Sequence, residues 1–322
     1  MFKAMFALLL AGVAVVAYYL FTPLTLPQTP FDFTVKPGSS LNSAARQMSE
    51  AGLLSQPLAF VALGRALDKA TQLKAGSYEL DAPVTPLRLL DMLTKGEVNQ
   101  GQFSIIEGWT FRQLRAALNA SPDVLHDSVA LSDAEMLHRI GVVEAHPEGL
   151  FFPDTYYFSK GDSDLAVLSR AYRTAHTTLA QEWAARADNL PLRTPYQALI
   201  LASIVEKETG AAADRGMIAA VFINRLRRGM LLQTDPTVIY GLGAAFDGNL
   251  RKRDLLADTP YNSYTRGGLP PTPIAMPGLA ALHAALHPDA SSALYFVARG
   301  DGSSEFSSTL EQHNRAVSRY QK

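Results

Sequence analysis

Two glutamates, Glu206 and Glu208, stand at the end of a segment that is apolar on nearly every side. The segment is Leu199–Val205 (LILASIV), and a helix of this composition is predicted to be buried. Desolvation disfavours the charged form of a carboxyl group and so raises its pKa. A carboxyl that keeps its proton near neutral pH can donate it to a leaving oxygen. This segment is therefore the strongest indication of acid–base chemistry in the chain.

The spacing of the two glutamates separates their side chains. Two residues apart on one helix, Glu206 and Glu208 point about 200° away from each other, so they do not form a carboxylate pair in one pocket. The residues alone do not decide which of them is catalytic. The alternative is a solvated helix end with no chemical role.

Two further groups of residues suit a sugar ligand. The stretch Glu148–Phe158 interleaves carboxylates with aromatic rings, although a core strand ending in a Pro–Asp turn would have the same composition. Asn and Gln side chains can bond two hydroxyl groups at once, which favours a glycan over a phosphate. Together with nearby Asp and Tyr residues they form a set of candidate hydrogen-bonding groups: Asn224, Gln233, Asp235, Tyr240, Tyr261, Asn262 and Tyr264.

Other chemistries find little support. His283 and His287 have the spacing of two metal ligands on a helix, but no Glu stands between them as in H-E-x-x-H and no third ligand is evident. We therefore predict no metal site and no cofactor. The absence of cysteine excludes disulfides and thiolate ligands, and the net charge of -1 argues against a nucleic-acid partner.

The N-terminus predicts a single membrane anchor. Ala4–Phe21 is an unbroken run of 18 apolar or glycine residues. As a helix it would be about 27 Å long, close to the hydrocarbon thickness of a bilayer. Lys3 before the run keeps the N-terminus in the cytoplasm and exports the rest of the chain. The alternative is a signal peptide cleaved after Val15–Ala17.

The remaining patterns predict an α+β protein in three parts. Residues 1–30 are the anchor and a Pro-rich spacer, 31–98 a small domain, and 99–322 a larger mixed domain. In the small domain we expect strands Phe31–Val35 and Gly76–Leu80. In the larger one, Thr194–Pro195 opens the glutamate helix, and Leu231–Pro236 is expected to be a strand followed by a turn.

Several ordered motifs resemble the endolytic murein transglycosylases, also called MltG or YceG-like proteins. The longest are Leu201–Thr209 (LASIVEKET), Val221–Leu226 (VFINRL) and Leu232–Gly241 (LQTDPTVIYG). The resemblance extends over nearly the whole chain. Shorter matches are Glu148–Tyr156, Tyr261–Tyr264, Gly268–Pro271 and Pro277–Gly278.

This resemblance implies a bacterial inner-membrane enzyme with a LysM-like domain at 31–98 and a periplasmic catalytic domain. The family cuts nascent peptidoglycan strands between MurNAc and GlcNAc, leaves 1,6-anhydroMurNAc ends and so terminates elongation. Its catalytic acid/base is the first Glu of E-K-E, which corresponds to Glu206. The resemblance also suggests penicillin-binding peptidoglycan synthases as partners.

We expect six residues to line the glycan groove: Asp154, Gln233, Asp235, Tyr261, Asn262 and Tyr264. Two alternatives remain open. A muramidase-type hydrolase would use the same site, with Asp154 or Asp235 as a second carboxylate. A membrane-tethered scaffold would bind peptidoglycan without cleaving it.

Overall fold

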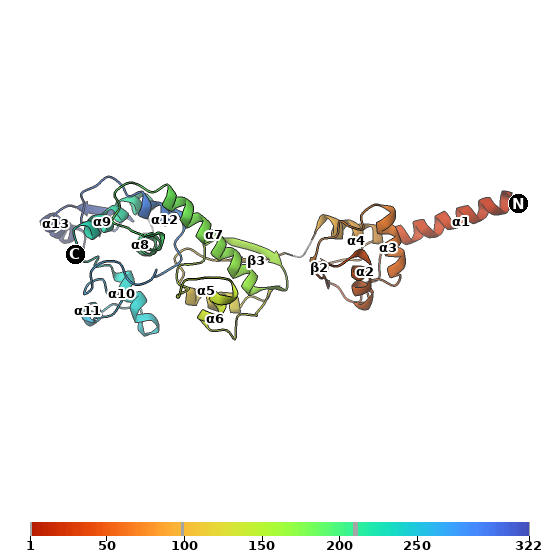
Figure 1. Ribbon diagram of the computed structural model, residues 1–322, viewed down its shortest axis with the longest axis horizontal. Coiled ribbons are helices and arrows are strands. Elements are labelled where there is room, and N and C mark those ends of the chain that lie inside the picture. Colours follow the sequence, from red (N-terminus) through yellow and green to blue (C-terminus); the bar gives the residue numbers. More distant parts are fainter. Residues whose placement is uncertain (1, 98–99, 209–211, 322) are drawn as a thin grey trace. The chain divides into compact units, whose positions relative to one another are not determined.

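The computed structural model describes residues 2–97, 100–208 and 212–321. These residues form a mixed α+β protein, as predicted, with short strands paired in two-stranded sheets (Figure 1). The chain divides into two compact units. The first comprises Met1–Gln102 with the short segments Asp123–Leu125 and Tyr157–Asp162, and the second comprises the rest. The predicted domain boundary between residues 98 and 99 lies outside the described residues.

Helix α1 (Phe2–Phe21) covers the apolar run at the N-terminus. Within the part of the chain that the structure describes, no helix has both the length and the apolar character needed to cross a membrane.

The first unit is a small sheet covered by helices. Strands β1 (Phe31–Val35) and β2 (Gly76–Leu80) pair antiparallel, with Phe33 opposite Tyr78. Alternate residues of β1 are buried, as period-two patterning requires. Both strands have the predicted bounds. The helices are α2 (Leu41–Glu50), α3 (Pro57–Ala66) and α4 (Pro86–Lys95).

The core of the second unit is built around helix α8 (Pro195–Glu208). Every residue from Ala198 to Val205 is buried, which confirms the predicted buried helix. Helices α9 (Arg215–Arg227), α12 (Leu279–Leu286) and α7 (Asp164–Ala184) pack against α8 (Figure 1). The buried Ser203 hydroxyl donates to the Ile200 carbonyl at 2.7 Å and accepts the Ile274 N–H at 3.0 Å. Its polar group is therefore satisfied inside the core.

The prediction of a strand at Leu231–Pro236 is wrong. These residues form no strand, and Asp235 instead begins helix α10 (Asp235–Leu242). Pro236 lies in the first turn of that helix, where a missing N–H has no intrahelical partner to lose. The other elements are β3 (Gln100–Ser104), α5 (Phe111–Asn119), β4 (Val124–Leu125), α6 (Asp133–Arg139), β5 (Thr155–Ser159), β6 (Asp162–Ser163), α11 (Lys252–Leu256), β7 (Tyr295–Ala298), β8 (Ser304–Ser307) and α13 (Leu310–Tyr320).

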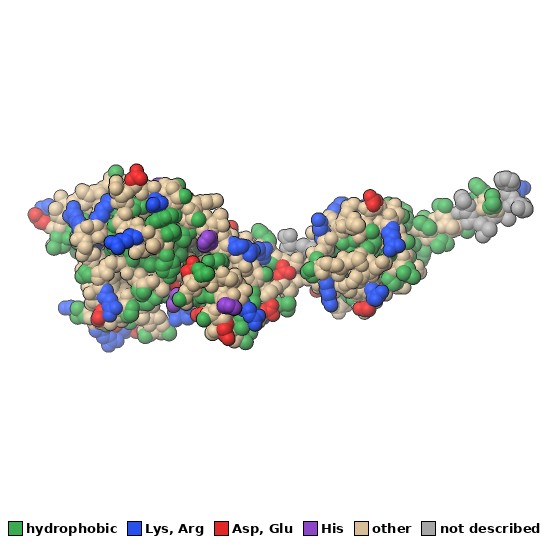
Figure 2. Space-filling view, viewed as in Figure 1, with side chains coloured by type: hydrophobic (Ala, Val, Ile, Leu, Met, Phe, Trp, Pro, Cys, Tyr) green, Lys and Arg blue, Asp and Glu red, His purple; other side chains and the backbone are tan. Residues whose placement is uncertain are grey.

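Charged side chains of both signs are interspersed on the face drawn in Figure 2. That face carries no broad basic stripe.

Candidate active site

Glu206 lies in the last turn of α8, at the point where the buried helix meets solvent. Its Oε2 accepts the backbone N–H of Gly278 at 3.0 Å. Partial burial has the largest influence on the pKa of this carboxyl group and raises it above the ordinary value. The hydrogen bond from Gly278 lowers the pKa, but by less. The negative end of the helix dipole acts in the same direction as burial. Glu206 is thus set up to hold a proton at higher pH than an ordinary glutamate.

A second carboxylate, that of Glu107, lies beside Glu206 and Gly278. A Cβ on residue 278 would overlap the Glu107 carboxyl group, so the absence of a side chain at Gly278 lets this carboxyl group lie there. The negative charge of Glu107 further raises the pKa of Glu206, while Arg215 and Lys207 lower it. The turn that holds Glu107 is fixed by backbone bonds from Gly108 N to Met276 O (2.8 Å) and from Met276 N to Trp109 O (2.7 Å).

Glu148 is the most strongly perturbed acid of the group. It is 3% exposed and accepts the N–H of Phe111 at 2.9 Å and the hydroxyl of Tyr240 at 3.0 Å. Both bonds favour the anion, but desolvation outweighs them and raises the pKa of Glu148 to about 7. A buried carboxyl that titrates near neutrality is characteristic of functional sites.

Glu148 faces a cavity of about 670 Å³. Lys207, the neighbour of Glu206, also lines it, so the end of α8 reaches this cavity. The rings of Tyr240 and Tyr261 meet edge to face on its wall, with centroids 4.9 Å apart. Aromatic rings beside acids and cations suit a carbohydrate, whose faces are apolar and whose edges carry hydroxyl groups. The remaining lining residues are Thr110, Arg112, Gln113, His146, Pro236, Ile239, Gly243, Phe246 and Ile274.

Glu208 belongs to a different cavity, of about 420 Å³, together with Gln233, Asp235 and Tyr264. The Thr234 hydroxyl donates to its carboxylate, and burial raises its pKa. The Tyr264 hydroxyl donates to Asp235 at 2.5 Å. The two glutamates of α8 therefore have separate partners, as their helical spacing requires.

The six residues predicted for the groove are thus not brought together. Tyr261 lines the cavity of Glu148, while Gln233, Asp235 and Tyr264 line that of Glu208. Asn262 is fully buried, and its amide donates to three backbone carbonyls, those of Asp254, Leu255 and Ala257. In this structure the Asn262 side chain holds the loop that carries its tyrosine neighbours.

Asp154 lies outside both of these cavities. It is exposed, and its carboxylate accepts the N–H of the next residue, Thr155, at 2.7 Å. Neither cavity, as the described residues form them, includes Asp154. Nor does the structure give Asp154 or Asp235 a contact with Glu206 that would make it a second catalytic carboxylate.

The residues that the structure adds to this site differ in how well their local sequence indicates them. Glu148 and Tyr240 lie within the motifs Glu148–Tyr156 and Leu232–Gly241, and a carboxylate among aromatic residues was a usable signal for Glu148. Glu107 follows a short strand and precedes Gly108, and no local pattern distinguishes it from a surface turn residue.

Comparison with known proteins places this chain in the YceG-like family, whose family model matches residues 33–319. The endolytic murein transglycosylase of Bacillus subtilis (strain 168) is 31% identical over 310 residues, covering 91% of this chain and 85% of that protein. The enzyme of the same name from Streptococcus pneumoniae (strain D39) is 28% identical over 323 residues, and the match covers 88% of this chain and 57% of that relative.

A crystal structure of a YceG-like protein from Listeria monocytogenes has the same fold over most of its length. The TM-score is 0.56 at 28% identity, and the match covers 88% of this chain and 98% of that one.

The perturbed pKa of Glu148 predicts a specific pH dependence of stability. Between its ordinary value of 4.5 and about 7, the unfolded chain ionises Glu148 more readily than the folded chain, so this contribution to stability is lost as pH rises. The full difference corresponds to about 3 kcal/mol. Glu148→Gln removes the titration. Its amide oxygen can still accept the Phe111 N–H, while its NH2 group would donate to the Tyr240 hydroxyl oxygen instead of accepting from it. Urea unfolding of this variant should therefore depend less on pH between about 4.5 and 7.5. Parallel curves for the two proteins would contradict the pKa of about 7.

Proposed function

We propose that this chain is an endolytic murein transglycosylase that cleaves nascent peptidoglycan strands, with Glu206 as its general acid/base. The observation that carries the proposal is a half-buried carboxyl with a raised pKa, held by a backbone N–H at the end of a buried helix. Membership in the YceG-like family supports the assignment, as do the relatives named endolytic murein transglycosylase.

In the proposed reaction, protonated Glu206 donates its proton to the oxygen that links MurNAc to GlcNAc. The bond from C1 to that oxygen breaks as an oxocarbenium-like state develops. The Glu206 anion then accepts the proton of the C6 hydroxyl of the same MurNAc, and O6 bonds to C1. The product is a 1,6-anhydroMurNAc end, and the glutamate returns to its starting protonation state. Such ends would terminate strand elongation.

The cavity beside Glu206 supplies a site for the sugars next to the cleaved bond. Tyr240 and Tyr261 offer aromatic faces, and Glu148, Lys207 and Arg112 offer charged groups to hydroxyls and peptide stems. The cavity around Gln233, Asp235 and Tyr264 is the second candidate region for the strand. We infer that the first cavity holds the sugars at the reacting bond, because it adjoins the end of α8 at Lys207.

We further propose that the Ala4–Phe21 run anchors the enzyme in the bacterial inner membrane, where it works beside penicillin-binding synthases on periplasmic strands. This part rests on the sequence run and on the resemblance. The strand–helix–helix–strand order from β1 to β2 supports a LysM-like, glycan-binding role for the first unit. Carbonate-washed membranes should retain the full chain and release residues 22–322. Full release of both proteins would contradict an anchor.

Replacing Glu206 tests the catalytic assignment. Glu206→Gln keeps the size of the side chain but removes the transferable proton, so cleavage should fall at least about 100-fold. Mass spectrometry of uncrosslinked glycan strands should show anhydro-ended fragments with the wild type. Glu208→Gln is the comparison variant, because it makes the same change on the same helix in the other cavity. Cleavage should fall much less in Glu208→Gln than in Glu206→Gln, since Glu208 is not the proposed proton donor.

The products also separate the alternatives. Fragments heavier by one water would indicate a hydrolase, for which Glu107, beside Glu206, is the second carboxylate that the structure offers. Binding of strands with no product from either protein would indicate a scaffold. Equal cleavage by Glu206→Gln and wild type would remove Glu206 from the mechanism.

Glu107 is expected to set the pH range of the enzyme. A general acid must be protonated, so activity declines as pH rises through the pKa of Glu206. Glu107→Gln removes a negative charge that raises this pKa, so the declining limb of kcat/KM should move to lower pH. Arg215→Gln removes a charge that lowers it and should move the limb to higher pH. Shifts in the same direction for both variants would contradict an electrostatic role for this pair of residues.

A further inference from the structure

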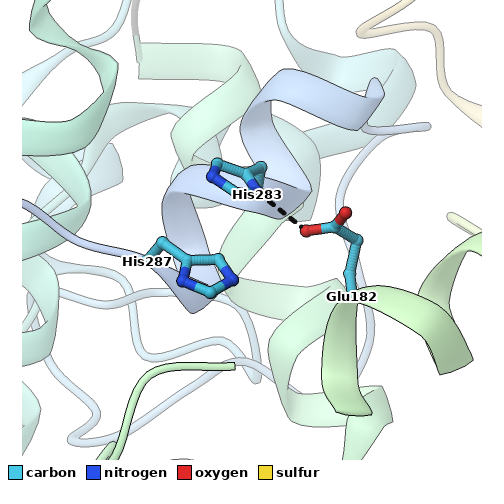
Figure 3. A group of neighbouring side chains, drawn as sticks. All are labelled: Glu182, His283 and His287. Atoms are coloured by element: carbon cyan, nitrogen blue, oxygen red, sulfur yellow. Dashed lines mark hydrogen bonds and ion pairs between the residues drawn. The ribbon is translucent and has the colours of Figure 1, made fainter. Parts of the chain in front are cut away.

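A histidine pair and a glutamate meet on one side of the second unit. His283 and His287 lie on and just after α12, and Glu182 lies on α7 (Figure 3). The imidazole Nδ1 of His283 is 2.9 Å from Oε2 of Glu182, and the two imidazole rings stack with centroids 4.3 Å apart. One potential ligand atom from each of the three side chains lies within 4.8 Å of the other two.

The local sequence explains this convergence. A spacing of four residues places His283 and His287 on the same face of the helix. Packing of α12 against α7 brings Glu182 to that face, and a backbone bond from Ala187 N to Leu286 O at 3.0 Å ties the segment after α7 to the end of α12. The third ligand that was not evident in the sequence thus comes from a helix about 100 residues earlier.

We propose that Glu182, His283 and His287 form a binding site for one divalent transition-metal ion, with Zn²⁺ as the reference ion. Two imidazole nitrogens and a carboxylate oxygen are a ligand set that Zn²⁺ and its neighbours in the first transition row accept. Around a tetrahedral ion with bonds of about 2.0–2.1 Å, ligand atoms are roughly 3.3 Å apart. The three atoms already lie within 4.8 Å of one another, and the exposed His283 side chain has room to adjust toward that separation.

The ion would act as a structural cross-link between α7 and α12. Helix α12 begins after Gly278, whose N–H binds Glu206, and its eight residues span about 12 Å. The proposed metal site therefore lies toward the C-terminal end of α12, whereas Glu206 lies at its N-terminal end. The metal ion would take no part in the proposed cleavage. A ligand that binds only the folded chain stabilises it in proportion to the logarithm of its concentration. Fixing α12 to α7 would also fix the position of the Gly278 amide.

The test is Zn²⁺ binding to the full chain, purified without a histidine tag, by competition with a chromophoric chelator. We expect one high-affinity ion per chain and a rise in Tm with Zn²⁺ concentration. X-ray absorption at the zinc edge should report nitrogen and oxygen neighbours at about 2.0–2.1 Å, two of them imidazoles. His283→Ala with His287→Ala should weaken binding at least about 100-fold, since even outer partners of metal ligands contribute about 10–100-fold.

Two further variants keep the proposal falsifiable. His126→Ala with His138→Ala removes two exposed histidines elsewhere and should leave affinity and the Tm response unchanged. Glu182→Gln keeps both imidazoles and should weaken binding at least about 10-fold. If the His283/His287 variant has native circular dichroism and an unchanged affinity for Zn²⁺, the proposed site is wrong. Equal losses in the His126/His138 variant, or no effect of Glu182→Gln, would overturn this ligand set. None of these readouts depends on the proposed transglycosylase activity.

Discussion

The middle of helix α8 is held out of water, and the candidate site depends on this burial. Eight consecutive residues, Ala198–Val205, are buried against α7, α9 and α12, so the helix cannot shift without exposing the centre of the second unit. Burial of the leucine, isoleucine and valine side chains among them is worth about 1.5–3 kcal/mol each. The same burial partly desolvates the carboxyls that follow and raises their pKa values. The stability of the core and the raised pKa values of these two carboxyl groups therefore have one physical origin, the burial of α8.

Burial alone does not make the two carboxyls of α8 equivalent. Glu208 accepts a hydrogen bond from a threonine side chain, and its neighbouring charge is Asp235. Glu206 accepts a backbone N–H, that of Gly278, and is flanked by one anion and two cations. Because Gly278 has no side chain, the space around Glu206 remains open to Glu107. Different surroundings can thus assign a structural role to one glutamate and a chemical role to the other.

The sequence could predict those features that depend on local composition. An apolar helix ending in Glu206 needs no tertiary information, and the strand pair of the first unit follows from alternation. By contrast, helical geometry could show that Glu206 and Glu208 diverge but not which partners each would meet. The prediction of a strand and turn before Pro236 is wrong because a Pro after a short apolar run fits both a turn and the first turn of a helix. Glu107 and Glu182 join their clusters only through packing of segments far apart in the chain.

The groove residues show most clearly what residue type leaves undetermined. Asn262 has the chemistry of a sugar-binding side chain, yet its amide donates to three backbone carbonyls at the end of α11. A buried amide that left those carbonyls would lose hydrogen bonds without regaining water, at a cost of about 1–3 kcal/mol for each unsatisfied group. The side chain instead holds the backbone beside Tyr261 and Tyr264, and its Oδ1 accepts the N–H of Tyr264 at 2.8 Å. The rings of Tyr261 and Tyr240 are in contact, and the Tyr240 hydroxyl donates to Glu148. The buried amide and the buried acid therefore belong to one continuous set of contacts.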